Sequence, residues 1–223
     1  MHSSAERIAE LTSMGAYFRK LWDARAAAPP AFDLISMLAH SEATRHLQAR
    51  EFIGTMALLI VGGNDTTRNS MTAGLMALVE NPDQFDLLRN RPELIPSLVS
   101  EIIRYHSPVL HMRRTARNDV DLAGRRIARG DKVVMWYISG NRDEGKIDRA
   151  DDFIIDRNKP RQHLAFGAGI HRCVGDRLAE QQIRILWEEI LRRDLRFEIV
   201  APPQRLYSNF IRGIRSLPVR IMV

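Results

Sequence analysis

The chain has 223 residues, 45% of them hydrophobic, and 33 lysines and arginines against 27 acidic residues give it a net charge of +6. This size and composition suit one globular domain with a hydrophobic core. A single cysteine excludes a disulfide framework and fits a reducing compartment. Arginine is dispersed and no nucleic-acid-binding motif is present, so we expect no nucleic-acid partner.

The sequence lacks the features of a secreted or membrane protein. The first seven residues contain no apolar signal core. The most apolar run, residues 52–61, is too short to span a bilayer. We therefore expect a cytoplasmic protein without a transmembrane segment.

Helices are predicted for the first half of the chain. Helical spacing of apolar residues predicts a first helix around residues 14–22, which Pro29 and Pro30 end. A short helix is expected over residues 33–39. Residues 50–80 form one long predicted helix, stopped by Asn81-Pro82, and residues 93–105 form another.

The second half mixes hairpins, loops and one helix. Residues 115–138 are predicted to form short strands, with turns at Gly124 and Gly130. Residues 141–161 are polar and irregular, and a helix is expected over residues 174–193. Short strands near residues 196–200, 207–211 and 218–222 close the chain.

Residues 62–67, Gly-Gly-Asn-Asp-Thr-Thr, lie in the middle of the long predicted helix. Two glycines inside a helix cost about 1 kcal/mol each relative to alanine, which suggests a use for the missing side chains. Threonine in mid-helix can bond back to a carbonyl and bend the helix. Packing of helices through small residues is the alternative explanation.

Glu101 and Arg104 stand at i and i+3 on the next predicted helix. Taken alone, such a pair is most often exposed and contributes little to stability.

The single cysteine, Cys173, lies in a glycine-rich stretch, FGAGIHRCVG over residues 166–175, directly ahead of the last predicted helix. The N-terminus of a helix offers free N–H groups and a positive dipole end, which favour a thiolate. Phe166 can keep water from the sulfur. The stretch therefore suits a metal-bound thiolate. The helix after it has apolar residues at Leu178, Ile185, Leu186 and Ile190.

Other roles for Cys173 remain open from the residues alone. A lone cysteine is most often a small buried hydrophobe. A structural zinc site is disfavoured, because one cysteine cannot supply the usual set of thiolates. A nucleophile could pair Cys173 with His171 or His163, although no protease-like signature accompanies them.

The stretch resembles the haem-binding loop of the cytochrome P-450 superfamily, the haem-thiolate monooxygenases. All five fixed positions of that loop match: Phe166, Gly169, His171, Cys173 and Gly175. The resemblance implies heme b, with Cys173 as the axial thiolate ligand of the iron. Such a ligand pushes electron density into the iron and favours cleavage of the O–O bond.

Further residues would complete the haem pocket. Gly167 would let the backbone approach the porphyrin closely. Arg114 stands where the superfamily uses an arginine to hold a haem propionate, through bidentate hydrogen bonds. His171 would take a similar role, although it could instead be a sixth ligand or a helix cap.

The Gly-Gly motif is similar to the oxygen-activation motif of the same superfamily. By position, Gly62 and Gly63 would open room for dioxygen beside the iron. Thr66 would donate a hydrogen bond to the oxygen ligand on the iron, and Asp65 would relay protons from solvent. Both would then be catalytic residues.

The Glu-x-x-Arg pair of this superfamily is buried and bonds to a later arginine. Arg157 occupies the place of that arginine here. The resemblance implies that Glu101, Arg104 and Arg157 support the haem pocket structurally, without a catalytic role.

Three segments of the sequence resemble bacterial soluble terminal hydroxylases of alkanes and fatty acids. They are residues 58–70, 130–137 and 170–173. The resemblance implies insertion of one oxygen atom at the terminal carbon of a medium-chain alkane or fatty acid. Apolar side chains suit such a substrate, although the same residues could be plain core. The expected substrate-facing positions are Leu58, Val61, Leu110, Phe210 and Ile211.

The implied electron source is NAD(P)H, acting through a ferredoxin reductase and a ferredoxin, with O2 as co-substrate. A basic face could receive an acidic electron carrier. Its candidates lie on or near the helix after the cysteine: Arg172, Arg177, Arg184, Arg192 and Arg193.

The expected fold is mainly α (α+β), the C-terminal half of the cytochrome P-450 fold, because a complete member of the superfamily is considerably longer. Residues 1–223 would form the C-terminal portion of a single domain, a partial chain that exposes apolar surface where the other half packs. A non-catalytic haem-binding fragment is one alternative function. A Cys–His nucleophilic enzyme without haem is another.

Overall fold

In the computed structural model, which describes residues 4–222, the chain divides between Gly62 and Gly63 into two units. The first unit holds α1 (Ser4–Ala26), α2 (Leu34–His40) and the start of α3 (Ala49–Glu80), the long helix that continues into the second unit. Asp33 begins α2, because its carboxylate accepts the Ser36 N–H at 2.8 Å.

The first unit has a small core of its own, in which Trp22, Ala39, Phe52 and Met56 are buried. The rings of Trp22 and Phe52 meet edge to face, with centroids 5.3 Å apart. The Arg19 guanidinium lies 3.9 Å from the centroid of the Phe52 ring. Aromatic packing and this cation–π contact hold α1 against the first part of α3.

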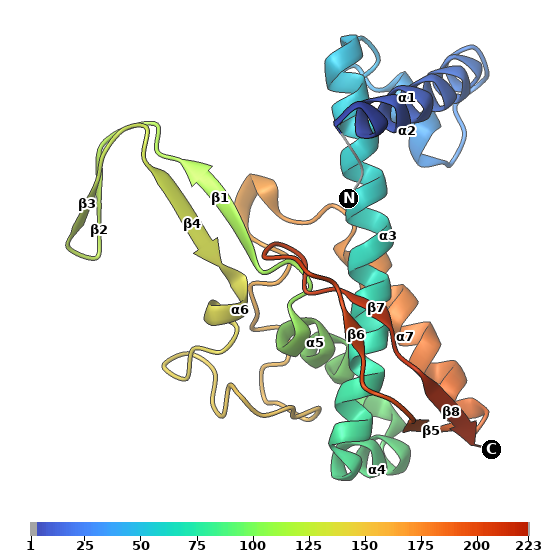
Figure 1. Cartoon of the computed structure of the whole chain (residues 1–223), viewed down its shortest axis with the longest axis vertical. Coiled ribbons are helices and arrows are strands. Elements are labelled where there is room, and N and C mark those ends of the chain that lie inside the picture. The colour runs from blue at the N-terminus through green and yellow to red at the C-terminus, as the bar shows by residue number, and fades with distance from the viewer. Residues whose placement is uncertain (1–3, 223) are drawn as a thin grey trace. The chain divides into compact units, whose positions relative to one another are not determined.

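Helices also form the main core of the second unit. Its buried residues come mainly from α3, α4 (Pro82–Asn90), α5 (Ile95–His106) and α7 (Asp176–Arg192), helices that Figure 1 labels. A short 3-10 turn, Pro92–Leu94, joins α4 to α5. α7 buries Ile183, Trp187 and Ile190, which share one helix face.

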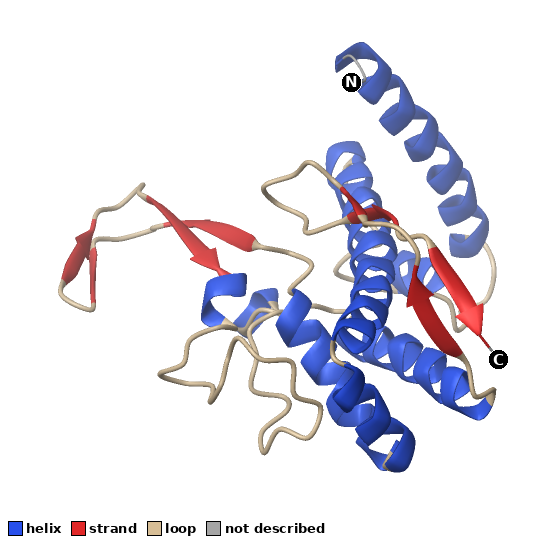
Figure 2. Cartoon of the chain, turned by 60° about the horizontal axis from the view of Figure 1, so that its bottom comes forward, coloured by secondary structure: helices blue, strands red, loops and turns tan. Residues whose placement is uncertain are grey.

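The strands of the described residues pair two by two, each pair antiparallel (Figure 2). β1 (His111–Thr115) pairs with β4 (Lys132–Trp136), and β2 (Val120–Leu122) with β3 (Arg125–Ile127). β5 (Arg196–Ile199) pairs with β8 (Val219–Met222), and β6 (Gln204–Arg205) with β7 (Ile214–Ser216). Gly124 and Gly130 make the predicted turns, with φ values of +74° and +95° that suit glycine.

Irregular backbone separates the hairpins from α7. It begins after α6 (Tyr137–Gly140) and contains a 3-10 turn, Gly169–His171. Figure 2 shows this segment as loop, in agreement with the prediction for residues 141–161. Its apolar residues Ile147, Ala150, Phe153 and Ile155 are nevertheless buried.

The predictions for the fold are confirmed in most helices and strands, with some differences. The first helix, α1, begins at Ser4, ten residues before the predicted start. Asn81 and Pro82 end α3 as predicted, and Pro82 also starts α4, a helix that the sequence analysis did not predict, because proline is favoured in the first turn of a helix. Residues 207–211 form no strand; Ile211 makes only a single bridge, to Val109. The last helix begins at Asp176, two residues later than predicted. None of the described helices is long and apolar enough to cross a membrane.

Candidate functional site

Cys173 lies in an exposed loop that folds back on itself. Its N–H donates to the carbonyl oxygen of Phe166 at 2.9 Å, and the Gly167 N–H donates to that of Leu164 at 2.8 Å. Gly167 and Gly169 have φ values of +67° and +66°, a left-handed conformation that other residues seldom adopt. The path of the loop therefore depends on two of the glycines that the sequence motif contains.

The loop is joined to the first turn of α7. Gly175 is the N-cap residue, so Cys173 precedes the helix by a short step instead of lying inside it. The Arg172 side chain bonds to the Asp176 carboxylate at 2.6 and 2.9 Å. The acidic residue also faces the positive end of the helix dipole, which stabilises this junction.

The loop is open to solvent and exposes two large apolar side chains. Ile170 and Val174, which flank the cysteine, are 96% and 89% exposed. A Cβ atom added at Gly169 or Gly175 would meet no atom within 4 Å. A flat apolar ring can lie against such a surface with the Cys173 thiol toward it, so these residues fit a cofactor of that shape.

Two apolar residues of α7 are not core residues. Leu178 and Ile185 are 63% and 46% exposed. They lie on a different face from Ile183 and Trp187, which are fully buried. The apolar spacing in the sequence therefore indicated the helix but not which face packs.

A histidine lies behind the loop. The His163 ring is 5.5 Å from the Phe166 ring, centroid to centroid. Burial, helped by the nearby Arg172 guanidinium, lowers the pKa of His163 to about 4. Among the described residues no hydrogen bond joins Cys173 to His163 or His171. The geometry gives no support to a Cys–His nucleophile.

Buried histidines predict a pH-dependent stability. Burial lowers the pKa of His106 from 6.5 to about 3, with Arg212 adding to the effect, and that of His163 to about 4. Both are protonated in the unfolded chain below pH 6.5 and neutral in the folded one. Their contribution to stability is therefore present above pH 6.5 and is lost as the pH falls toward these values.

In haem-free protein we expect the free energy of unfolding to fall between pH 6 and 4.5 by up to about 1.4 kcal/mol per pH unit for each of these histidines. Urea unfolding at a series of pH values measures this slope. His106→Asn and His163→Asn should each remove one share of it, whereas the exposed His46→Asn should not. A slope unchanged in both buried variants would contradict the assignment.

Glu101 and Arg104 form a buried ion pair, with 0% and 1% of their side chains exposed. Arg104 Nε and Nη2 donate to the two carboxylate oxygens at 2.7 and 2.8 Å. Arg157 Nε reaches the same carboxylate at 3.0 and 3.1 Å. The Ile154 N–H adds a further bond, at 2.8 Å. The three residues predicted to act together are thus in direct contact, and their pairing is buried.

The same arginines fasten the irregular segment to α5. Arg104 donates to the carbonyl oxygens of Asn141, Ala150 and Asp152 at 2.6–2.9 Å. Arg157 donates to those of Arg149 and Asp152 at 2.8 and 2.7 Å, and to that of Asp148. A segment without regular secondary structure thereby has its carbonyl groups satisfied by buried guanidinium groups.

Arg114 and His171 are available for an anionic group. Arg114 lies half-buried in β1, and its Nη1 donates to the Arg113 carbonyl oxygen at 3.0 Å. Within residues 4–222 it has no carboxylate partner. His171 is exposed in the 3-10 turn before the cysteine. In the part of the chain that the structure describes, no hydrogen bond joins Arg114 to His171.

The Gly-Gly motif lies in the continuous helix α3. A Cβ atom added at Gly62 or Gly63 would meet no atom within 4 Å, so the helix has open space beside it there. Asp65 is exposed and pairs with Arg68 at 2.9 Å. Thr66 is half-buried, and its carbonyl oxygen accepts the Ser70 hydroxyl at 2.9 Å. Solvent access suits Asp65 for proton exchange.

The expected substrate-facing residues lie in both units. Leu58 and Val61 belong to the first, where they are 71% and 59% exposed. In the second, the Leu110 N–H donates to the Phe210 carbonyl oxygen at 2.9 Å, and Ile211 bridges to Val109. Leu110, Phe210 and Ile211 are therefore neighbours, and none of the five is a fully buried core residue.

The arginines of the expected basic face are paired with carboxylates of α7. Each has an acidic partner within 2.6–3.5 Å. The pairs are Arg172–Asp176, Arg177–Glu180, Arg184–Glu188, Arg192–Glu189 and Arg193–Glu189. The face is thus a mixture of charges rather than an unopposed basic surface.

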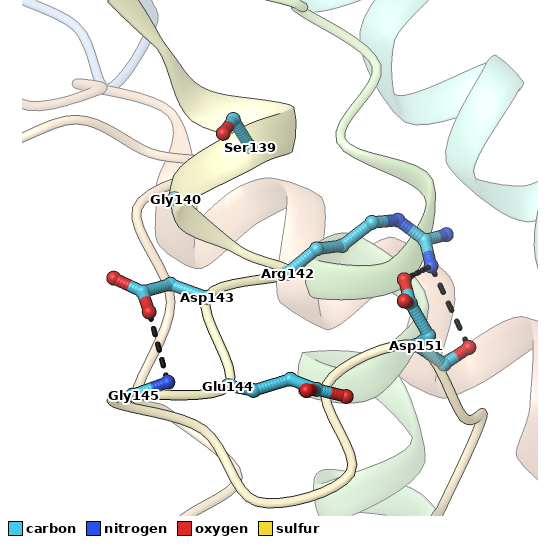
Figure 3. Close-up of a pocket in the computed structure, with 7 residues that line it drawn as sticks. All are labelled: Ser139, Gly140, Arg142, Asp143, Glu144, Gly145 and Asp151. Atoms are coloured by element: carbon cyan, nitrogen blue, oxygen red, sulfur yellow. Dashed lines mark hydrogen bonds and ion pairs between the residues drawn. The ribbon is translucent and has the colours of Figure 1, made fainter.

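A hollow of about 530 Å³ lies beside α6, and Cys173 is not among its lining residues. Figure 3 shows Arg142 reaching Asp151, whose carboxylate it meets at 2.8 Å, while Asp143 accepts the Gly145 N–H. The lining is open and charged, with glycines and no large apolar side chain. It does not suit a hydrocarbon.

Comparison with known proteins defines the class. The sequence profile of the family described as Cytochrome P450 matches residues 84–213, more than half of the chain. The chain belongs to the cytochrome P450 family. Proteins of this family carry haem with a cysteine thiolate ligand and receive electrons from NAD(P)H through redox partners.

Particular relatives are similar over nearly the whole chain. Linalool 8-monooxygenase of Pseudomonas putida is 46% identical over 204 residues, 91% of this chain and 50% of that protein. A methyl-branched lipid omega-hydroxylase of Mycobacterium tuberculosis is 43% identical over 190 residues, 84% of this chain and 44% of that protein. The chain thus spans about half the length of the curated relatives it matches.

Solved structures give the same result. Cytochrome P450-153 from Novosphingobium aromaticivorans is 49% identical, with a TM-score of 0.92 over 97% of this chain and 54% of that one. The predicted fold, mainly α with small hairpins and about half of a cytochrome P450, is confirmed.

Proposed function

We propose that the chain is the C-terminal portion, residues 1–223, of a single cytochrome P450 domain in a cytoplasmic haem-thiolate monooxygenase. Cys173 would bind the iron of heme b through its thiolate. The observation that carries this proposal is the only cysteine of the chain, exposed in a glycine-shaped loop that also exposes Ile170 and Val174. The haem supplies the redox chemistry that activates O2 when it is bound.

Other residues of the chain would bind the haem and supply protons. Phe166 keeps water from the sulfur, and Arg114 and His171 bind the propionate carboxylates by charge-assisted hydrogen bonds. Gly62 and Gly63 leave room beside α3 for a small ligand. Thr66 holds a proton at its hydroxyl, and Asp65, open to solvent, supplies it.

In the overall reaction, one oxygen atom of O2 enters a C–H bond of the substrate. The other leaves as water, formed with two electrons from NAD(P)H and two protons, one of which comes from solvent.

The substrate we propose is a medium-chain alkane or fatty acid, hydroxylated at its terminal carbon. The apolar side chains Leu58, Val61, Leu110, Phe210 and Ile211 suit a substrate without hydrogen-bonding groups. The similarity to a protein named as a lipid omega-hydroxylase supports terminal oxidation. A ferredoxin and its reductase deliver the electrons.

A carbon monoxide spectrum of the reduced, haem-loaded protein tests this function, followed by turnover of n-octane, dodecanoic acid and linalool. A red-shifted Soret band with terminal hydroxylation of the first two supports it. The band without turnover would indicate a non-catalytic haem-binding fragment. Failure to take up haem would overturn the assignment of Cys173, and preferred turnover of linalool would overturn the substrate class.

Thr66→Ala is expected to uncouple electron use from product formation, because the proton that Thr66 holds is lost. Product per NAD(P)H consumed should fall roughly 100-fold, the low end of the range for a positioned proton donor. Product and hydrogen peroxide are measured together. Thr72→Ala, which removes a hydroxyl bonded to the Arg68 carbonyl on the same helix, is the matched control. Equal product per electron in both variants would contradict the role of Thr66.

A further inference from the structure

Asn141, which the sequence places in an unremarkable polar stretch, is fully buried at the end of α6. Its side-chain oxygen accepts the Leu164 N–H at 2.6 Å, and its amide nitrogen donates to the Ser107 hydroxyl at 2.8 Å. Its carbonyl oxygen accepts Arg104 Nη1 at 2.7 Å. A buried amide with partners at both side-chain atoms is fixed in one orientation.

The side-chain partners of Asn141, Ser107 and Leu164, come from segments far apart in the sequence. Ser107 ends α5, with a φ of +45°, and its hydroxyl donates to the Arg104 carbonyl oxygen at 2.8 Å. Leu164 opens the turn that leads to the cysteine, since its carbonyl oxygen accepts the Gly167 N–H. Asn141 therefore ties the start of the cysteine loop to the helix that carries the buried ion pair.

Close packing supports the same junction. A Cβ atom added at Gly140 would lie 2.8 Å from Leu164 Cδ1, and one added at Gly167 would lie 3.2 Å from the Tyr137 hydroxyl. The segment Tyr137–Asn141 is thus in direct contact with residues 164–167. Phe166 lies within this contact region, and its carbonyl oxygen accepts the Cys173 N–H.

We propose that Asn141 is a positioning residue for the cysteine loop, and that its bond to the Leu164 N–H holds Cys173 where it can ligate the haem iron. The inference rests on the proposed function. The ion pairs of Glu101 with Arg104 and Arg157, here called the Glu101 network, hold the irregular segment against α5. Asn141 bonds to the end of α5 and to Leu164, so it holds the start of the cysteine loop against the same helix. Asn141 itself is fully buried, and Cys173 is not among its hydrogen-bond partners.

The test replaces Asn141 in the haem-loaded protein and records the reduced carbon monoxide spectrum. Leaving a buried N–H unpaired shifts the equilibrium between the native and the displaced position of the loop by roughly 10- to 100-fold. We expect Asn141→Leu to lower the ratio of the red-shifted band to the band at the ordinary position by that factor. Asn141→Asp keeps an oxygen for the Leu164 N–H and should restore most of the ratio. A ratio in Asn141→Leu equal to that of the wild type would overturn the inference.

Asn69→Leu is the matched control. Asn69 is also buried, donating to the Asp65 carbonyl oxygen and accepting the Ile214 N–H, each at 2.8 Å. Its loss should lower thermal stability to a similar degree without changing the band ratio. An equal change of band ratio in both variants would show that Asn141 acts through general stability alone, and would overturn the inference.

Two further measurements keep the test decisive. Hydrogen exchange at the Leu164 N–H in haem-free protein should accelerate about tenfold or more in Asn141→Leu and not in Asn69→Leu. This readout does not depend on haem, so it separates failure of the inference from failure of the proposed function. If Asn141→Leu does not fold, Ser107→Gly removes the other anchor at a backbone angle that suits glycine, and should lower the band ratio partially. Unchanged exchange or an unchanged ratio would contradict the proposal.

Discussion

Cys173→Ser is expected to abolish the red-shifted carbon monoxide band and to lower hydroxylation by roughly 100-fold or more, the scale of losing a central catalytic group. A serine hydroxyl is not ionised near neutral pH and cannot replace the thiolate. Because the chain has one cysteine, no other residue of it can supply a second thiolate ligand. The spectrum of the reduced haem-loaded protein and the rate of product formation measure the two effects.

Ala168→Ser is the control for this substitution. Ala168 is exposed in the same loop, so the change adds a hydroxyl near the site without removing the sulfur. Its band and activity should remain those of the wild type. If Cys173→Ser kept the red-shifted band, another group would have to be the ligand, and the proposed site would be wrong.

Glu101→Ala is expected to lower the free energy of unfolding by roughly 3–5 kcal/mol, because it leaves two buried guanidinium groups without their carboxylate. Arg104 and Arg157 side chains are only 1% and 8% exposed, so water cannot replace the lost partner. Haem retention should fall as well, since the arginines hold the irregular segment that leads to the cysteine loop. Urea unfolding and haem content measure the two effects.

Glu189→Ala is a matched control, because Glu189 also pairs with two arginines, Arg192 and Arg193. Those pairs lie at the surface of α7, where solvent screens them, and little change in stability is expected. The difference between the two variants isolates the effect of burial. Similar small losses in both would show that the Glu101 network does not support the fold as described.

Local sequence features predicted much of the fold and of the site. Asp33 caps α2, and Gly124 and Gly130 turn the hairpins, because each acts on backbone only a few residues away. The cysteine loop is equally local, since Phe166 bonds to Cys173 within one stretch. A contiguous motif of this kind carried the resemblance that the family comparison confirms.

Contacts across long sequence separations could not be predicted in the same way. Pro82 both follows the end of α3 and starts α4, and the sequence predicted only the first, because α4 depends on packing of Leu88 into the core. Leu178 and Ile185 fit the apolar spacing of α7, yet the face with Ile183 and Trp187 is the buried one. Spacing gives the periodicity of a helix, whereas its neighbours select the face.

The sequence by itself determined the glycine-shaped cysteine loop, the long helix with its Gly-Gly motif and the mainly helical character of the chain. All of these follow from the conformational preferences of neighbouring residues. Only the tertiary structure decided that Glu101 is buried between two arginines and that Asn141 joins Ser107 to Leu164. Burial and hydrogen bonding between distant segments depend on how the whole chain packs. The residues next to an asparagine in the sequence do not show whether its side chain is buried or exposed.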